Sequence, residues 1–268
     1  MNNLIKMIIF ANWKIYMTSR EQVKKYVEVL KKGLKNFNDE VLEVHIMADF
    51  LSFEYIKKNL ADTNIKCGVQ DIFWEDHGPF AGEVSPLMLK DIGCDSVYLG
   101  HSERKTLFGE TEENINKKLH ACLRNSIKPF MFVGETLEEL KSHMTKSVIK
   151  RQLKIGLQGV SKTMLKDIVI IYEPRWAIGK KESASNEIIS SMHSMTRRLI
   201  SELYGTELAQ DIPILYGGSV NLENISKIIT MREVDGVGAA RAAINPDDFI
   251  RLVRIVEKEA INRYQFKK

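Results

Sequence analysis

Residues 168–172 read Ile-Val-Ile-Ile-Tyr, a run without a charged residue, and Glu173-Pro174 follow it directly. A strand that is apolar on both faces is buried on both faces, which is typical of a parallel sheet covered by helices. Residues 7–10, Met-Ile-Ile-Phe, form a second run of the same kind. These two runs predict an α/β protein built on a parallel sheet.

Strand and helix patterns alternate along the whole chain. Apolar or β-branched runs predict eight strands, at 5–13, 44–48, 66–70, 96–99, 129–133, 168–172, 212–216 and 234–239. Apolar residues at helical spacing predict helices at 19–34, 111–124, 137–158, 186–203, 221–230 and 246–256. Such alternation requires right-handed crossovers between parallel strands.

Eight predicted strands, with helices between most of them, in 268 residues favour a closed (β/α)8 barrel. The alternative is an open, doubly wound sheet, which would place a glycine-rich phosphate turn after the first strand. Here the first strand ends in Asn12-Trp13-Lys14 with no glycine nearby. Because no linker rich in Pro, Gly or Ser divides the chain, we expect residues 1–268 to form one domain.

Composition excludes several classes of protein. An apolar content of 44% argues against wholesale disorder, and the net charge of +4, with acidic and basic residues interspersed, argues against a dedicated nucleic-acid binder. No stretch approaches the ~20 apolar residues of a membrane span, and residues 4–13, which include Lys6, are interpreted as a strand rather than a signal peptide. Cys67, Cys94 and Cys122 lie far apart, so a disulfide framework is not expected and a reducing cytosol fits.

In a (β/α)8 barrel the catalytic groups come from the C-terminal ends of the strands. The groups at the predicted ends include an ammonium (Lys14), an imidazole (His101), a carboxylate (Glu173) and two glycine-containing turns, at 217–219 and 238–241. Glycine turns that run into helix starts leave backbone N–H groups free to bind an anion. No second histidine stands at metal-ligand spacing, so we expect no metal site. The set predicts a phosphorylated substrate and proton transfer without a cofactor.

Seven segments carry a resemblance to a known family: Asn12-Trp13-Lys14, Gly82-Glu83-Val84-Ser85-Pro86, Leu99-Gly100-His101-Ser102-Glu103-Arg104, Gly134-Glu135-Thr136-Leu137, Tyr172-Glu173-Pro174, Trp176-Ala177-Ile178-Gly179 and Tyr216-Gly217-Gly218-Ser219-Val220. They occur in the order of the triosephosphate isomerase family and span almost the whole chain. The resemblance implies a (β/α)8 TIM barrel and a cofactor-independent aldose–ketose isomerase of glycolysis and gluconeogenesis. It also implies a cytoplasmic homodimer that interconverts glyceraldehyde 3-phosphate and dihydroxyacetone phosphate through an enediolate.

The resemblance also implies roles for five residues. Glu173 is the base, with a pKa that partial desolvation would raise. His101 donates a hydrogen bond to the enediolate as a neutral imidazole whose pKa a helix N-terminus lowers, and the family is itself a standard example of such tuning. Lys14 supplies positive charge, and Asn12 supplies a hydrogen-bond donor. Glu103 is expected as the buried partner that orients Lys14, the alternative being a surface ion pair with the next residue, an arginine.

A mobile lid would begin at 176–179, exclude water when closed and protect the enediolate. The hydroxyl of Tyr216 is expected to hold the closed lid near Ala184, with plain packing as the alternative for this tyrosine. By the same resemblance, backbone N–H groups of Gly179 and Ser219, together with the Ser219 hydroxyl, would bind the substrate phosphate.

The sequence departs from the family at several places. Ala240-Arg241 stand where two adjacent glycines usually complete the phosphate site, so this turn offers a guanidinium to the phosphate or to a distal hydroxyl. Residues 178–184 read Ile-Gly-Lys-Lys-Glu-Ser-Ala instead of Ile-Gly-Thr-Gly-Lys-Thr-Ala. Ala81 replaces a threonine that reaches towards the partner subunit's site, and Tyr16 replaces an interface asparagine.

These departures, and Trp74-Glu75-Asp76 after the third strand, resemble a divergent branch that isomerises erythrulose phosphates. The first alternative function is therefore the conversion of L-erythrulose 1-phosphate to D-erythrulose 4-phosphate by the same mechanism. An alternative from another class is a non-catalytic barrel that binds a phosphorylated ligand.

Overall fold

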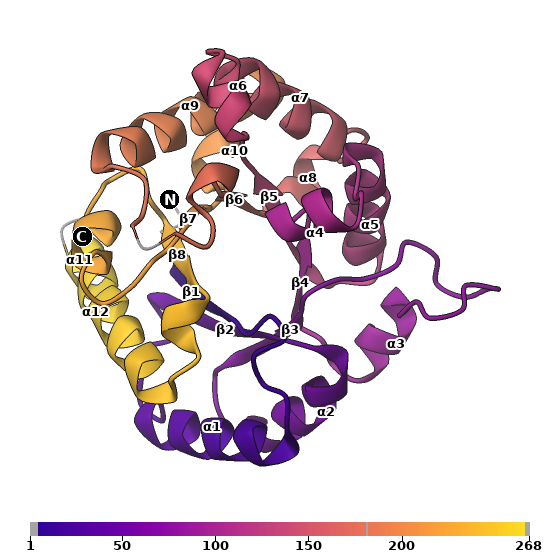
Figure 1. Cartoon of the computed structure of the whole chain (residues 1–268), viewed down its shortest axis with the longest axis vertical. Coiled ribbons are helices and arrows are strands. Elements are labelled where there is room, and N and C mark those ends of the chain that lie inside the picture. Colours follow the sequence, from indigo (N-terminus) through magenta and orange to yellow (C-terminus); the bar gives the residue numbers. More distant parts are fainter. Residues whose placement is uncertain (1–4, 181, 266–268) are drawn as a thin grey trace.

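Eight parallel strands form a closed barrel in which each strand pairs with its neighbours in chain order (Figure 1). The structure is a computed structural model that describes residues 5–180 and 182–265. The strands are β1 Met7–Asn12, β2 Leu42–Ala48, β3 Lys66–Val69, β4 Ser96–Leu99, β5 Lys128–Val133, β6 Val169–Tyr172, β7 Ile214–Gly217 and β8 Gly236–Ala239. The first strand closes the barrel by pairing with the last, from Ile8↔Gly236 to Ala11↔Ala239. The expected fold class is confirmed.

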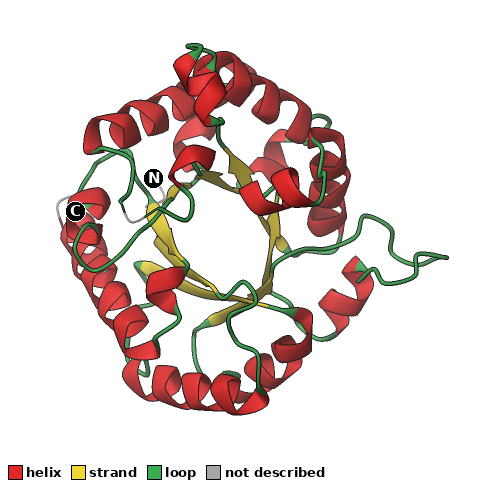
Figure 2. Ribbon diagram, in the orientation of Figure 1, coloured by secondary structure: helices red, strands yellow, loops and turns green. Residues whose placement is uncertain are grey.

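Helices surround the barrel on its outer face (Figure 2). They are α1 Arg20–Gly33, α2 Phe50–Asn59, α3 Pro86–Asp91, α4 Ser102–Leu107, α5 Glu112–Arg124, α6 Leu137–Lys141, α7 Thr145–Gly156, α8 Lys162–Leu165, α9 Asn186–Tyr204, α10 Thr206–Asp211, α11 Ile225–Ile229 and α12 Pro246–Gln265, with 3-10 turns η1 Arg175–Ala177 and η2 Arg241–Ala243. The helix expected at 19–34 is present, with Ser19 as its N-cap in a capping box with Gln22.

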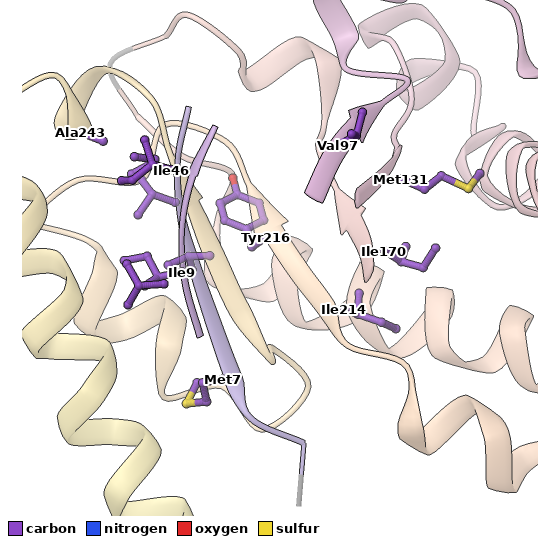
Figure 3. Close-up of a cluster of buried hydrophobic side chains, with 14 of the residues drawn as sticks. Met7, Ile9, Ile46, Val97, Met131, Ile170, Ile214, Tyr216 and Ala243 are labelled. Atoms are coloured by element: carbon purple, nitrogen blue, oxygen red, sulfur yellow. The ribbon is translucent and has the colours of Figure 1, made fainter. Parts of the chain in front are cut away.

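The two faces of each strand belong to different layers. In β1, Ile8 and Phe10 point into the barrel, whereas Met7 and Ile9 belong to the layer between barrel and helices. Figure 3 shows part of this outer layer. Alternate side chains of a strand point to opposite faces. The continuous apolar runs of β1, β5 and β6 therefore arise because both faces of these strands pack against apolar side chains.

Four aromatic rings pack together inside the barrel. Phe10, Tyr98, Phe130 and Phe132 come from three strands, and Phe10 meets the other three rings edge to face at centroid distances of 5.3–6.4 Å. A Cβ atom at Gly238 would lie 2.0 Å from the Phe10 ring, so this β8 position requires glycine. The rings share the barrel core with aliphatic side chains, and Phe10 and Phe132 form the floor beneath its C-terminal end.

Some helix and strand boundaries differ from the expected ones. The helix predicted at 137–158 is two helices, because the chain turns between them at His143, whose φ of 55° lies in the left-handed region. The last helix continues to Gln265 rather than ending at 256. The first strand is shorter than 5–13 and ends at Asn12, and α2, α3, α8 and α10 lie in segments for which no helix was expected.

Candidate active site

A cavity of about 310 Å³ opens at the C-terminal ends of the strands. It brings together eight of the eleven residues expected from the sequence: Asn12, Lys14, His101, Glu173, Gly179, Ser219, Ala240 and Arg241. These come from the ends of β1, β4, β6, β7 and β8 and from the segment after β6. Convergence of polar groups from several strand ends on one cavity is the usual arrangement of an active site in this fold.

Lys14 is held in a strained conformation just after β1. Its φ is 46°, and a non-glycine residue in this region costs about 1–3 kcal/mol unless its surroundings enforce it. The Asn12 Oδ1 atom accepts the Lys14 backbone N–H at 3.0 Å, and the Gln70 side-chain amide donates to the Lys14 carbonyl at 3.0 Å. These two bonds fix the turn, so the ammonium group is aimed into the cavity from a rigid base.

The Glu103 carboxylate contacts Lys14 directly, with 2.5 Å between Oε1 and Nζ. The expected pairing with Lys14 is therefore present, and the neighbouring arginine pairs with Asp71 at 2.9 Å instead. The expectation that Glu103 is buried is wrong, because 40% of its side chain is exposed. It is the N2 residue of a six-residue helix whose outer side faces solvent, and water reaches the carboxylate there. We therefore assign the pair an orienting role rather than a large share of stability.

His101 and Glu173 lie against each other at the centre of the site. The His101 Nε2 atom is 3.2 Å from Glu173 Oε1, and the backbone N–H of Ser102 donates to Glu173 Oε2 at 2.9 Å. Side-chain exposure is 8% for the histidine and 6% for the glutamate. Glu173 follows β6 in a tight contact with β5: a Cβ atom at Gly134 would lie 1.8 Å from the Glu173 carbonyl oxygen. Only glycine permits this approach.

The ring orientation of His101 follows from its place at a helix start. His101 is the N-cap of α4, and its Nδ1 atom accepts the backbone N–H of Glu103 at 3.2 Å. A ring nitrogen that accepts a hydrogen bond carries no proton, so the neutral ring has its proton on Nε2, facing Glu173 and Asn12. The Asn12 side-chain nitrogen lies 3.4 Å from this Nε2 atom.

The pKa directions differ from those expected. Burial raises the pKa of Glu173 as predicted, but the His101 charge and the hydrogen bonds from His101 and Ser102 outweigh burial and hold the pKa below its usual value. Burial lowers the pKa of His101, but the Glu173 carboxylate outweighs it and raises the pKa. Both expectations are thus wrong for this arrangement, because each group faces the other at contact distance. His101 and the Ser102 N–H thus stabilise the ionised form of Glu173.

The turns after β7 and β8 form the opposite wall of the cavity. The Ser219 hydroxyl, on a residue with φ of 50°, contacts the Ala177 and Lys180 carbonyl oxygens at 3.1 and 2.8 Å. The Arg241 guanidinium donates to the Gly179 carbonyl at 3.3 Å. The structure thus places the expected phosphate-binding residues beside each other and ties both turns to the segment that begins at Trp176.

The segment 176–184 is also held at its far end. The Tyr216 hydroxyl accepts the Ala184 backbone N–H at 3.0 Å, and both residues are buried. The contact expected between these two residues is present. Lys181, one of the residues in which this segment departs from the family, lies outside the described residues.

Several residues of the cavity were not singled out from the sequence. Phe10 and Phe132 line its floor, and the His101 ring packs edge to face on Phe132 with a centroid distance of 5.2 Å. Their inward direction follows from strand alternation, which a precise strand register would have given. Tyr16 and Lys180, which the sequence singled out only as departures from the family, also line the cavity. Within residues 5–180 and 182–265, no group of three His, Cys, Asp or Glu side chains could hold a metal ion.

Known proteins match the chain over nearly its full length. A model of the family described as triosephosphate isomerase matches residues 7–256. The triosephosphate isomerase of Dictyoglomus thermophilum is 42% identical over 250 residues, which cover 92% of this chain and 98% of that protein. Proteins of the same name from Thermoanaerobacter pseudethanolicus and Geotalea uraniireducens are 39% and 38% identical, over 92% and 94% of this chain and 98% and 99% of theirs. The match includes every strand of the barrel.

Proposed function

The chain belongs to the triosephosphate isomerase family, and from this premise we propose how its cavity interconverts glyceraldehyde 3-phosphate and dihydroxyacetone phosphate. The observation that carries the proposal is the contact of Glu173 with His101 at 3.2 Å in the cavity that Lys14 also lines. A base, a hydrogen-bond donor and a cation around one small space are the groups that proton transfer through an enediolate needs.

Glu173 is the base that moves a proton between the two adjacent substrate carbons. A base must come within about 3 Å of the proton that it takes. Both carboxylate oxygens are engaged here, one by His101 and one by the Ser102 N–H, so Glu173 leaves these partners when substrate binds. Losing two hydrogen bonds and one charged neighbour removes the influences that lower its pKa, while burial remains. The carboxylate therefore becomes more basic as it reaches the substrate.

His101 acts as the hydrogen-bond donor to the enediolate oxygens. Its proton on Nε2 points into the cavity, because Nδ1 accepts the Glu103 N–H. When Glu173 moves away, the influence that raises the pKa of His101 falls. The Glu103 backbone N–H, which donates to Nδ1, then favours the neutral ring. Lys14, oriented by Glu103, places positive charge where negative charge develops, and Asn12 adds a donor beside it.

The turns after β7 and β8 hold the substrate phosphate. Gly179, Ser219, Ala240 and Arg241 line one wall of the cavity. Closure of the segment 176–184, with Tyr216 and Ala184 in contact, excludes water and keeps the enediolate from losing its phosphate.

The location of Arg241 is the reason to test a second substrate, an erythrulose phosphate. Its guanidinium lines the cavity and contacts Gly179, so it offers a donor that a longer, four-carbon sugar phosphate would use. The discriminating experiment is a comparison of kcat/KM for glyceraldehyde 3-phosphate and L-erythrulose 1-phosphate, with Glu173→Gln as the control. We expect the triose phosphate to win by 100-fold or more, roughly 2.7 kcal/mol of discrimination. A preference for the tetrulose phosphate would show that the enzyme is an erythrulose phosphate isomerase. Turnover of neither substrate would show that the protein is a non-catalytic barrel that binds a phosphorylated ligand.

We propose that the enzyme acts as a homodimer. The segments after the first four strands carry large apolar side chains that are exposed in the single chain, at fractions from 39% to 97%: Ile15, Tyr16, Phe50, Leu51, Phe80, Leu87, Met88, Leu107 and Phe108. Two of these residues directly follow Lys14. An apolar surface of this extent is typical of an interface, and the partner would then border the active site.

The segment between β3 and α3 projects from the body of the barrel (Figure 1). Its base is fixed to α5, through Asp71 with Lys118 at 2.6 Å and through Asp76 with Arg124 at 3.1 Å. A projection with an ordered base is suited to insertion into a partner subunit. Light scattering should give twice the chain mass of 30.7 kDa, and Leu51→Lys should shift it towards the monomer. A wild-type monomer would contradict the dimer.

We also infer a cytoplasmic location. All three cysteines are free and buried, as in proteins of a reducing compartment. Across the described residues, none of the helices is both long and apolar enough for a transmembrane segment.

A further inference from the structure

The segment that follows Glu173 is fixed to the end of β5. The Arg175 backbone N–H donates to the Glu135 carbonyl at 3.0 Å, and the Trp176 indole N–H donates to Glu135 Oε1 at 2.8 Å. The Tyr172 hydroxyl reaches the same carboxylate at 3.1 Å. Glu135 is fully buried. On this side, the turn η1 therefore has a rigid support.

The Arg175 side chain connects the same segment to α4. Its Nη2 atom donates to the Thr106 hydroxyl at 2.6 Å. The first turn of α4 supplies the Ser102 N–H to Glu173 at 2.9 Å, and its N-cap is His101. Two bridges thus join the segment to α4: one through Glu173 itself and one through Arg175, two residues later.

These two bridges behave differently in the proposed reaction. The Glu173–Ser102 bridge breaks when the carboxylate moves to the substrate, whereas the Arg175–Thr106 bridge involves no group that touches the substrate. We propose that Arg175 is a positioning residue, which holds the segment carrying Glu173 against α4 while the carboxylate moves, and so sets its distance from His101. This inference rests on the proposed role of Glu173.

Part of the surroundings of Arg175 is electrostatically unfavourable, although its charge also acts favourably on Glu138, whose pKa is lowered chiefly by a backbone hydrogen bond and in smaller part by Arg175. The neighbouring Lys105 has only 7% of its side chain exposed, and its pKa is lowered, chiefly by burial and further by the Arg175 charge. The Arg175 Nε atom is buried without a hydrogen-bond partner among the described residues. An uncharged side chain would avoid both penalties. A bridge that positions the base accounts for a cation at this site.

The test is a double-mutant cycle with Arg175→Met, Thr106→Val and the double variant, assayed with glyceraldehyde 3-phosphate. Each single change should lower kcat about 3- to 10-fold and leave KM within about twofold, and the double variant should be no slower than the slower single. Arg175→Lys keeps a donor and should recover part of kcat. The matched control is Arg151→Met, which removes a surface arginine 3.8 Å from Glu139 and should leave kcat unchanged.

A primary deuterium isotope effect on kcat separates positioning from simple loss of folded protein. Slower proton transfer should enlarge the isotope effect in Arg175→Met, whereas a smaller folded fraction would leave it unchanged. Wild-type kcat in both single variants, additive effects in the double variant, or an effect on KM alone would each overturn the inference. If Glu173→Gln is inactive and Arg175→Met behaves as wild type, this inference alone fails. If Glu173→Gln is fully active, the proposed function fails.

Discussion

Opposite ends of the barrel each hold a buried histidine against a glutamate. At the C-terminal end, His101 lies 3.2 Å from Glu173. At the N-terminal end, His45 Nε2 lies 3.1 Å from Glu43, and its Nδ1 lies 3.0 Å from the Ser96 hydroxyl. The second cluster has the residue types of a hydrolytic triad, yet we assign the chemistry to the first.

Space does not distinguish the two ends. The cavity beside His45 and Glu43 is about 650 Å³, larger than the one at the other end. The two ends differ in whether substrate can reach the polar groups and in how each carboxylate is paired. Ser96 is 0% exposed, so no substrate reaches its hydroxyl. Burial raises the pKa of Glu43, but His45 and Lys128, at 2.8 Å, outweigh it and hold the pKa far below its usual value.

Glu43 is therefore a weak base held by His45 and Lys128, whereas Glu173 leaves its partners in the proposed reaction. No glycine turn that could hold an anion stands beside Glu43 among the lining residues described. An adjacent anion site, and a carboxylate that the proposed reaction releases from its partners, mark the active end; the presence of a His–Glu pair alone does not. In this fold, residues at the N-terminal face usually contribute to stability rather than to catalysis.

The largest effect that separates the two ends should come from Glu173→Gln. Glutamine keeps the size of the side chain and can still accept the Ser102 N–H, but it takes no proton from carbon. We expect kcat to fall by about 10³- to 10⁴-fold with KM nearly unchanged, as measured by steady-state kinetics. Circular dichroism should show a wild-type fold. Loss of less than tenfold would mean that another group is the base.

Lys14→Met should have the next largest effect. It removes the charge aimed at the enediolate. Glu103 loses its partner, but the fold should tolerate this because 40% of the Glu103 side chain is exposed to water. We expect kcat/KM to fall by about 10²- to 10³-fold. Lys128→Met, which removes the lysine that pairs with Glu43, is the matched control and should leave kcat/KM within about twofold. Equal losses in both variants would erase the distinction between the ends.

His45→Gln should change stability and leave catalysis alone. Glutamine cannot bridge both Ser96 and Glu43, so one buried polar group loses its partner. We expect a loss of about 1–3 kcal/mol in the free energy of unfolding, measured by urea titration. The kcat of the folded enzyme should stay at the wild-type value. A tenfold fall in kcat without a loss of stability would show that the N-terminal cluster takes part in the reaction.

A further effect on stability, similar in size, should come from lowering the pH. Burial lowers the pKa of His45, with Glu43 opposing, and lowers the pKa of His193 to about 3. A folded-state pKa below the unfolded value of about 6.5 gives stability that is present above pH 6.5 and lost as the pH falls. His101, whose pKa is raised, opposes this with the reverse sign. We expect the free energy of unfolding to fall by about 1–3 kcal/mol from pH 7 to pH 5, and by less in His45→Gln. Equal or greater stability at pH 5 would contradict these protonation states.

The fold could be predicted from the sequence because periodicity reports burial. Strands buried on both faces gave the parallel barrel, and the helix that Ser19 caps was found to within a residue. The break at His143 was missed, since a polar residue in the left-handed region leaves no mark on apolar spacing. The short helices α3 and α10 were missed for a related reason: six residues are too few to show a period.

The site residues could be located because strand ends and motifs are both visible in sequence. Their electrostatics could not be predicted, because these depend on contacts between residues far apart in the chain. The low pKa of Glu173 comes from His101, 72 positions earlier, and the exposure of Glu103 depends on which side of α4 faces solvent. The Arg175–Thr106 bridge likewise joins two segments that no motif connects.

Hydrogen exchange at the substrate carbon tests the assignment of chemistry to the C-terminal end most directly. Dihydroxyacetone phosphate would be incubated in D₂O with wild-type protein, Glu173→Gln or His45→Gln, and deuterium at its C1 followed by proton NMR. We expect exchange with the wild type and with His45→Gln at equal rates per folded molecule, and exchange slowed by about 10³-fold or more with Glu173→Gln. Wild-type exchange in Glu173→Gln, or its loss in folded His45→Gln, would contradict the assignment.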